Sequence, residues 1–302
     1  MLFSEEVLSS SDPFYQKVLN DFFSINGKEN LDEVESYLLS LKEPSRRLWS
    51  SYRTEHVKVN YDDPLIQASY FLRYCPLYYS SIFRVLNAIK KDYMPSVGSD
   101  YLEYSFMCAG PGSEALGFFD WLKENHPSEL ETYNEISLYD SSKWGLPRKV
   151  IKKALQESLD ENDGFSINEN TANVNFTKDL FFNTNQKIIL FQNCLNEILS
   201  TNIHMNSLLK NILKMTRDLV SGGLLIFIDR EGYKNTVDFY IQLEEILPKN
   251  CRQIFTEEMQ QQVNSYPPIS IPDVLINNLF DWTNGLKPSK NNRIVCRVFQ
   301  KQ

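Results

Sequence analysis

The sequence predicts an α/β fold, in which a mostly parallel β-sheet follows a helical N-terminal segment. A strand, a glycine turn and a helix follow one another directly over residues 101–122. Apolar strand-like runs then alternate with amphipathic segments, which is typical of βαβ units. Residues 1–95 contain one glycine, Gly27, and show helical spacing of apolar side chains. We therefore expect a helical subdomain over 1–97 and an α/β domain over 98–302.

Composition narrows the class of protein. The chain has 302 residues, of which 42% are hydrophobic, enough to bury a full core. Its five cysteines are far apart in sequence, so neither a disulfide framework nor a metal site is predicted. The net charge of −8 repels phosphate backbones, which favours a small molecule or a protein over nucleic acid as the substrate. No apolar run approaches the ~20 residues of a membrane span, and we expect a soluble, cytoplasmic protein without a membrane partner.

The N-terminal segment is expected to form several helices. Leu31 and the apolar residues at positions 34, 38 and 41 recur at helical intervals. Pro44 and the pair Asp63-Pro64 mark breaks, because proline disfavours the helical conformation of the residue before it. We expect a further helix to begin at about Pro76.

After residue 100, strands and helices are expected in alternation. Gly222 and Gly223 follow a helical segment and are expected to end it. The long stretch 263–289 precedes the last strand, and we interpret it as an insertion that shapes the substrate site. The expected strands are 101–108, 135–140, 173–179, 187–192, 224–229, 251–256 and 293–299, with helices from 115, at 146–159, around 205–212 and at 237–247, and a loop at 161–171.

The turn Ala109-Gly110-Pro111-Gly112 outlines a binding site. It places backbone N–H groups and a helix N-terminus at the carboxyl edge of the sheet, where open α/β sheets bind ligands. Glycine lets a ligand approach the backbone and permits a positive φ. The same turn also occurs as a simple connection, so it is informative only together with the acids that end the following strands, Asp140 and Asp179.

This pattern resembles the class I S-adenosylmethionine-dependent methyltransferases from about residue 101 onward. The resemblance implies a Rossmann-like seven-stranded sheet of order 3-2-1-4-5-7-6, with the last strand antiparallel, and S-adenosyl-L-methionine as cofactor. It implies that Asp140 binds the ribose hydroxyls and that Asp179 meets the adenine amino group. A carboxylate suits the ribose because its two oxygens can accept from neighbouring hydroxyls. The residues implied to hold the methionine part of the cofactor are Ala109, Gly110 and Gly112.

The sequence departs from the family pattern at two positions. Phe106 and Cys108 stand where the family often has an acid and a glycine. Glu103 and Glu114 are the candidates to replace the missing contact with the amino-acid part of the cofactor, and we assign Glu114 to the cofactor. The departure keeps an alternative function open, in which the chain binds the cofactor or only a partner and does not catalyse.

The segment around Tyr70 and Arg73 is similar to a Tyr, Arg, Pro and Tyr pattern in a methyltransferase family associated with the small ribosomal subunit. That family's cysteine cluster is not visible here. We expect the N-terminal helices to cover the site as a lid, in which Tyr70, Tyr78 and Tyr79 close over it. Arg73 is expected to pair with the cofactor's carboxylate. An aromatic helical stripe is, however, more often simply part of a core.

Residues after the fourth strand face the transferable methyl group in this family. Asn193 is the candidate to contact cofactor and acceptor, and Glu197 is a candidate base for transfer to an O or N centre. Glu197 also suits the start of a helix, where negative charge is favourable. Cys194 fits either a nucleophile or a buried thiol. The residues expected to line the acceptor pocket are Asp229, Glu231 and Tyr233.

Overall fold

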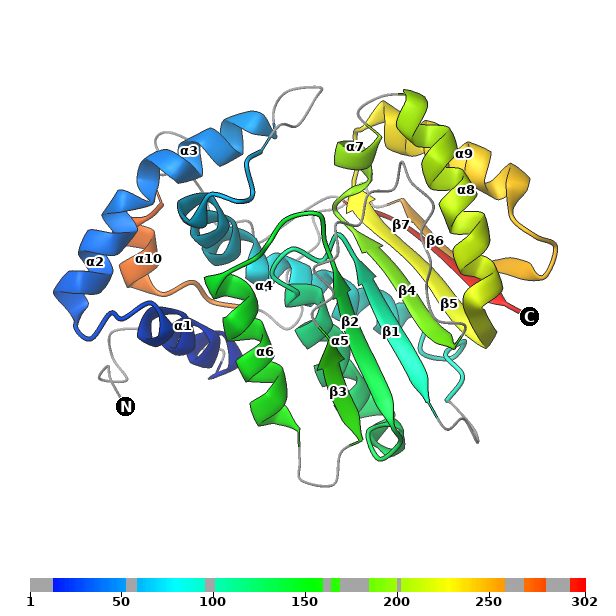
Figure 1. Ribbon diagram of the computed structural model, residues 1–302, viewed down its shortest axis with the longest axis horizontal. Helices are drawn as coiled ribbons and strands as arrows, with labels where there is room; N and C mark the ends of the chain where they lie inside the picture. Colours follow the sequence, from blue (N-terminus) through cyan, green and yellow to red (C-terminus); the bar gives the residue numbers. More distant parts are fainter. Residues whose placement is uncertain are drawn as a thin grey trace.

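A computed structural model describes residues 13–52, 59–95, 101–159, 164–168, 185–199, 202–258, 269–280 and 294–302. Its centre is a seven-stranded sheet of order β3-β2-β1-β4-β5-β7-β6, with helices against both faces (Figure 1). Only β7 runs antiparallel to its neighbours among the described strands. The predicted sheet order is confirmed. The strands are β1 (Leu102–Met107), β2 (Asn134–Tyr139), β3 (Phe165–Asn168), β4 (Gln186–Gln192), β5 (Leu219–Arg230), β6 (Cys251–Glu258) and β7 (Ile294–Lys301).

The N-terminal segment forms helices, as predicted, and helices also connect the strands. None of the described helices combines the length and the apolar character needed to cross a bilayer. The helices are α1 (Pro13–Ile25), α2 (Leu31–Ser40), α3 (Lys42–Ser51), α4 (Pro64–Ala88), α5 (Ser113–Asn125), the short 3-10 helix η1 (Pro127–Glu129), α6 (Leu146–Ser158), α7 (Leu195–Ile198), α8 (Asn202–Asp218), α9 (Lys234–Ile246) and α10 (Asp273–Asn278).

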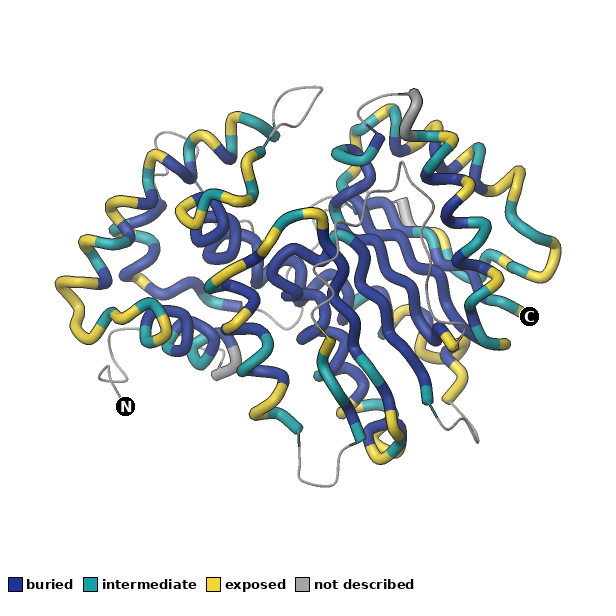
Figure 2. Tube along the Cα trace, in the orientation of Figure 1, coloured by how far each residue is buried: buried dark blue, intermediate teal, exposed yellow. Residues whose placement is uncertain are grey.

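The central strands are buried on both faces, as their continuous apolar sequences predict. In β4, Ile188 and Leu190 belong to an apolar cluster with the helices α1, α2, α4, α5, α6 and α10. Ile189 and Phe191 point to the opposite face, into a cluster with α7, α8 and α9. Figure 2 shows this as a band of buried strands between helices whose outer turns are exposed. The N-terminal helices thus share a core with the sheet.

Helix α4 is longer than predicted, because it continues through Pro76. It begins at the predicted break, with Pro64 in its first turn and the Asp63 carboxylate accepting from the Leu65 N–H at 2.9 Å. Pro76 has no N–H for the carbonyl of Leu72, one turn earlier. The hydroxyl of Tyr15, on α1, donates to that carbonyl at 3.2 Å. A contact from another helix therefore satisfies the carbonyl that the proline leaves free, and the predicted boundary was wrong.

Two further predictions about local structure need correction. The third strand is Phe165–Asn168, inside the segment predicted as a loop. The predicted strand 173–179 and Asp179 lie outside the described residues. Gly222 and Gly223 lie within β5, not at the end of α8, which ends at Asp218. The pairing of β4 with β5 shifts register here and Gly222 has φ 75°, so the glycines form an irregularity within the strand.

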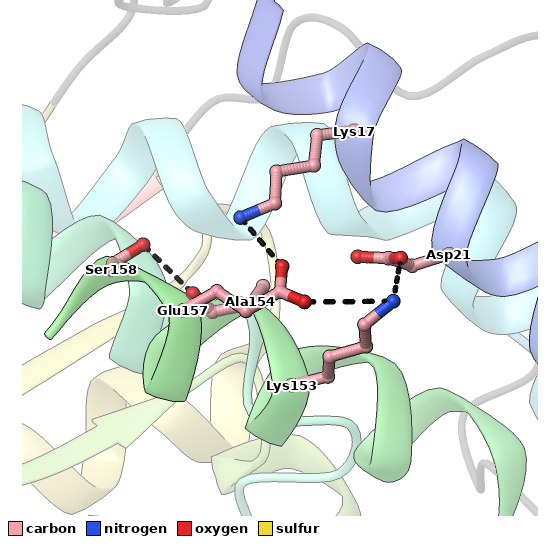
Figure 3. A network of polar contacts seen from close by, with 6 residues as sticks. All are labelled: Lys17, Asp21, Lys153, Ala154, Glu157 and Ser158. Carbon is pink, nitrogen blue, oxygen red and sulfur yellow. Dashed lines mark hydrogen bonds and ion pairs between the residues drawn. The ribbon is translucent and has the colours of Figure 1, made fainter. Parts of the chain in front are cut away.

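Helix α1 also docks on α6 through surface ion pairs (Figure 3). Lys17 meets Glu157 at 2.9 Å, and Lys153 pairs with Asp21 and with Glu157. Ser158, at the end of α6, donates to the carbonyl of Ala154 at 2.7 Å. These lysines are substantially exposed, so the ion pairs orient α1 and add little stability.

The described part of the 263–289 stretch packs against the N-terminal helices. Ile271, Leu275 and Phe280 are buried in the cluster that includes α2. Figure 1 shows α10 beside α2, at the far side of the molecule from α8 and α9. The rest of the stretch, and with it the predicted contribution to the substrate site, lies outside the described residues.

Helices α4 and α5 touch at the level of their backbones. A Cβ on Gly117 of α5 would lie 2.3 Å from the carbonyl oxygen of Tyr79 and 2.8 Å from Cγ2 of Ile82, both on α4. Side chains reinforce the contact, since the Trp121 indole donates to Asn87 at 3.0 Å. The Tyr79 hydroxyl donates to Asp120 at 2.8 Å. Only glycine fits at position 117 without separating the two helices.

We expect Gly117→Ala to lower the free energy of unfolding by about 1–3 kcal/mol, although alanine favours helix formation, because the methyl group collides with backbone. Urea unfolding measures the change. Glu124→Ala, on an exposed position of the same helix, is the control and should change stability little. A Gly117→Ala protein as stable as the wild type would contradict the close contact.

Candidate cofactor and acceptor site

The glycine turn has the backbone conformation expected of a close-approach loop. Gly110 has φ 52° and Gly112 has φ 89°, and the N–H of Ala109, just before them, donates to the Tyr139 carbonyl at 2.9 Å. Cys108 has φ 54°, an uncommon value for a residue with a side chain. It therefore adopts the conformation that favours the glycine of the family pattern. Such strain is typical of binding sites held by the surrounding structure.

The two glycines have different surroundings. A Cβ on Gly112 would lie 2.8 Å from Cδ1 of Leu138, so this glycine allows α5 to pack against β2. A Cβ on Gly110 would lie 3.2 Å from the ring of Trp144. Gly110 thus lies against the Trp144 ring, and Gly112 lies against the Leu138 side chain of β2.

Asp140 holds the turn from the end of β2. One carboxylate oxygen accepts from the Gly110 N–H at 2.8 Å, and the other accepts from the Ser142 N–H at 2.9 Å. The residue is largely buried, with 8% of its surface exposed. Each oxygen retains a further lone pair, so the carboxylate can still accept from hydroxyl groups.

Arg148, on α6, supports the same turn through hydrogen bonds to its backbone, a role that the sequence did not indicate. This buried guanidinium donates twice to the Gly110 carbonyl, at 2.6 and 3.1 Å. It also donates to the Leu138 carbonyl at 3.3 Å. A basic residue in the first turns of an amphipathic helix usually faces solvent, and only the fold shows that this one turns inward.

Helix α4 lies over the turn and connects the N-terminal helices to the site. Gln67 donates to the carbonyls of Tyr61 and Lys143 at 2.6 and 2.7 Å and accepts from the Gly145 N–H at 2.9 Å. The ring of Tyr70 lies 5.2 Å from that of Trp144. One predicted lid residue, Tyr79, points instead toward α5. The N-terminal helices and the loop after β2 are therefore fastened together at the site.

Arg73 is buried without a partner for most of its charge. Only 7% of its surface is exposed, and its Nε and Nη1 have no hydrogen-bond partner in the part of the chain that the structure describes. Its guanidinium lies 5.4 Å from the centre of the Tyr74 ring. An ion pair or charge-assisted hydrogen bond normally offsets the cost of burying a cation. Arg73 therefore suits an anionic ligand group.

Two acids near β1 differ in their surroundings. Burial raises the pKa of Glu114, in the first turn of α5, to about 8, and the charge of Arg148 opposes this shift. Glu103 lies near the start of β1, away from the carboxyl edge, and accepts from the hydroxyls of Tyr139 and Ser105 at 2.8 and 3.1 Å. Of the two, Glu114 is placed to meet a ligand at the turn.

Asn193, directly after β4, also presents unpaired polar atoms. It has φ 53°, and its backbone N–H donates to the Ile228 carbonyl at 2.7 Å. Its side-chain oxygen and nitrogen are buried and have no hydrogen-bond partner among the described residues. A strained backbone and an unsatisfied buried amide are both features that cluster at functional sites.

A small cavity lies between the N-terminal helices and the ends of β4 and β5. Tyr78, Asn193, Asp229 and Tyr233 line it, whereas Glu231 is exposed and is not part of the lining. The sequence analysis missed several of its members. The complete lining is Tyr52, Tyr74, Tyr78, Asn193, Asn196, Asp229, Arg230 and Tyr233.

Glu197 lies beside this cavity, behind Tyr52. Its carboxylate accepts from the hydroxyls of Tyr61 and Tyr52 at 2.9 and 3.3 Å, and the two hydroxyls bond to each other. Burial raises the pKa of Glu197 to about 7, against the effect of both phenols. A carboxyl group with this pKa can exchange protons near neutral pH.

Cys194 has the character of a buried thiol. The neighbouring Cys108 thiol and burial raise the pKa of Cys194 well above its usual range. A nucleophilic cysteine needs the thiolate, which this environment disfavours. The observation opposes the nucleophile interpretation.

Glu114 should make stability depend on pH. The unfolded chain releases the Glu114 proton near pH 4.5, whereas the folded protein keeps it until about pH 8. The stability that protonated Glu114 contributes is therefore fully present below pH 4.5 and is lost as the pH rises through about 8. We expect Glu114→Gln to unfold like the wild type in acid and to be more stable by ~2–4 kcal/mol above pH 8. Urea unfolding across pH tests this, with Glu124→Gln as the control. Parallel stability curves for wild type and Glu114→Gln would exclude a raised pKa.

No protein-family model and no curated protein sequence matches the chain. Solved structures resemble it at low identity. A Haemonchus contortus phosphoethanolamine N-methyltransferase 2 in complex with S-adenosyl-L-methionine is 15% identical, with a TM-score of 0.39 over 81% of this chain and 60% of that one. This chain thus spans less than two thirds of that enzyme. A TehB-like SAM-dependent methyltransferase from Corynebacterium glutamicum is 14% identical, with a TM-score of 0.37 over 75% and 98% of the two chains.

The [4+2]-cyclase SpnF is 11% identical, with a TM-score of 0.39 over 82% of this chain and 98% of that one. Similarity at this level concerns the fold alone. The sheet order itself identifies that fold, with β7 inserted antiparallel between β5 and β6. The chain has the Rossmann-like fold of the class I S-adenosylmethionine-dependent methyltransferases.

Proposed function

We propose that the protein is an S-adenosyl-L-methionine-dependent methyltransferase that acts on an O or N centre. The observation that carries the proposal is two buried ionisable groups of opposite type, Arg73 on α4 and Glu114 in the first turn of α5, directly after the glycine turn. Among the described residues, Nε and Nη1 of Arg73 have no hydrogen-bond partner, and Glu114 is held as an acid by burial. The amino-acid end of the cofactor carries a carboxylate and an ammonium group. It would supply the missing partner to each residue and so offset the cost of burying them.

The remaining residues fit the other parts of the cofactor. Ala109, Gly110 and Gly112 form the turn that would receive the methionine portion, and Asp140 retains acceptor capacity for the ribose hydroxyls. Asn193 lies between this side and the acceptor cavity, so its unpaired amide could contact both. Asp179 stays a prediction for the adenine amino group.

The bound cofactor supplies an electrophilic methyl group, and the protein must align an acceptor with it. The cavity beside Asn193 is closed by tyrosines of the N-terminal helices, which would act as the lid. Its small size and the negative net charge favour a small molecule or a protein side chain as acceptor. Tyr233 and Glu197 would position the acceptor and take its proton.

Calorimetric titration with S-adenosyl-L-methionine and S-adenosylhomocysteine tests the cofactor directly. We expect both to bind. Failure of both to bind to the folded protein would reject the proposed function and support a partner-binding role. Binding without methyl transfer to any acceptor class would support the noncatalytic alternative.

Arg73→Met should separate binding from stability. Removing a buried charge whose Nε and Nη1 have no partner among the described residues should leave the free energy of unfolding unchanged or increase it. The loss of a charge-assisted contact should weaken S-adenosylhomocysteine binding by about tenfold or more, equivalent to ~1.4 kcal/mol or more. Thermal unfolding and calorimetry measure the two effects. Arg46→Met, on the surface of α3, is the control. A variant with lower stability and normal affinity would show that Arg73 is structural.

A further inference from the structure

The acceptor cavity is walled by phenol rings from the N-terminal helices. Tyr74 and Tyr78 lie one turn apart on α4 and stack at 5.7 Å with their planes 13° apart. Tyr52, after the end of α3, meets Tyr74 edge to face at 5.8 Å. Tyr233 closes the cavity from the end of β5. The faces of such rings attract cations, most strongly where water is excluded.

Charges of both signs surround the cavity, since the Arg73 guanidinium lies 5.4 Å from the Tyr74 ring and Glu197 contributes a carboxyl group. Asp229 and Arg230 are neighbours of opposite charge, and the Asp229 carboxylate accepts from the N–H groups of Leu195 and Arg230 at 2.9 and 2.8 Å. Their charges offset each other. Glu197 has only the neutral phenols of Tyr52 and Tyr61 as hydrogen-bonding groups in the described structure, and Asp140 and Asp229 add negative charge. An entering cation would supply the compensating charge.

Tyr52 connects this carboxyl group to the cavity. It lines the cavity, and its hydroxyl donates toward Glu197 at 3.3 Å. The same hydroxyl is bonded to that of Tyr61, which donates to Glu197 at 2.9 Å. A proton that leaves a molecule in the cavity can therefore reach Glu197 through Tyr52 without crossing open water.

Resting on the proposed methyl transfer, we propose that the acceptor is an alkylamine, bound as its ammonium cation among these tyrosines, and that Tyr52 conducts its proton to Glu197. An ammonium ion has no lone pair and must lose a proton before it can attack. The ammonium gives a proton to the Tyr52 oxygen while Tyr52 gives its own to Oε1 of Glu197. The free nitrogen lone pair then bonds to the methyl carbon, and the sulfur–carbon bond breaks with its electrons left on sulfur. The products are the N-methylammonium ion and S-adenosylhomocysteine.

Tetramethylammonium chloride is a suitable probe, because its charge is permanent and it carries no proton that titrates. tert-Butanol is the neutral comparison of similar size. We expect ligand-observed NMR to show saturable binding of tetramethylammonium and much weaker binding of tert-butanol. Glu197→Gln should weaken tetramethylammonium binding by about tenfold or more, because it removes the charge behind the rings. Tyr133→Phe, at an exposed tyrosine, should leave it unchanged. Equal binding of the two probes, or unchanged affinity in Glu197→Gln, would overturn the amine assignment.

The pH dependence tests the link to Tyr52. The affinity of wild type for tetramethylammonium should rise as pH passes about 7, where Glu197 ionises. Tyr52→Phe keeps the ring but removes a phenol that stabilises the carboxylate, so the midpoint should move to higher pH. An unmoved midpoint would reject the role of Tyr52.

A parallel titration with S-adenosylhomocysteine separates the two proposals. A protein that binds S-adenosylhomocysteine but not tetramethylammonium would refute the amine acceptor and leave the cofactor assignment standing. Binding of tetramethylammonium alone would support the cation site and contradict the proposed methyltransferase function.

Discussion

The backbone contact between α4 and α5 at Gly117 is the constraint on which the site depends. Helix α5 begins at the glycine turn, so its position is tied to β1 and to the ligand edge of the sheet. Helix α4 carries Gln67, Arg73 and the tyrosines of the cavity. Because the two helices meet without intervening side chains, a small shift of one must move the other. The N-terminal helices are therefore positioned as part of the site.

Two buried arginines differ in whether their guanidinium groups find hydrogen-bond partners within the described structure. Arg148 donates to the Gly110 and Leu138 carbonyls, and this satisfied cation stiffens the turn. Arg73 is similarly buried, but two of its nitrogens have no partner in the described part of the chain. Glu114 and Asn193 carry a comparable cost, as an acid with a raised pKa and as an amide without a partner among the same residues. A protein keeps such costs where a ligand can offset them, which is why we propose these three residues as part of the binding surface.

Local sequence signals predicted most elements, and the exceptions have physical causes. Pro76 looked like a helix start because a proline leaves the carbonyl one turn earlier without its helical N–H partner. The Tyr15 hydroxyl, from a residue distant in sequence, satisfies that carbonyl, and local sequence could not show this. Gly222 and Gly223 looked like a helix end because glycine adopts positive φ in caps and in strand irregularities alike. The short strand β3 carries too few apolar residues to stand out, and its pairing with β2 defines it.

The sequence by itself determined the order of strands and helices, the glycine turn and the acid after β2, because periodicity and backbone requirements are local properties of the chain. It also placed Arg73, Asn193, Glu197 and Tyr233 at element ends or on faces that could reach one site. Only the tertiary structure decided which of these groups are buried and unpaired, and that Tyr79 turns away while Tyr52 and Arg148 turn in. Burial and pairing depend on residues brought together from distant parts of the chain, so the partners of a charge, and hence its pKa, exist only once the chain has folded.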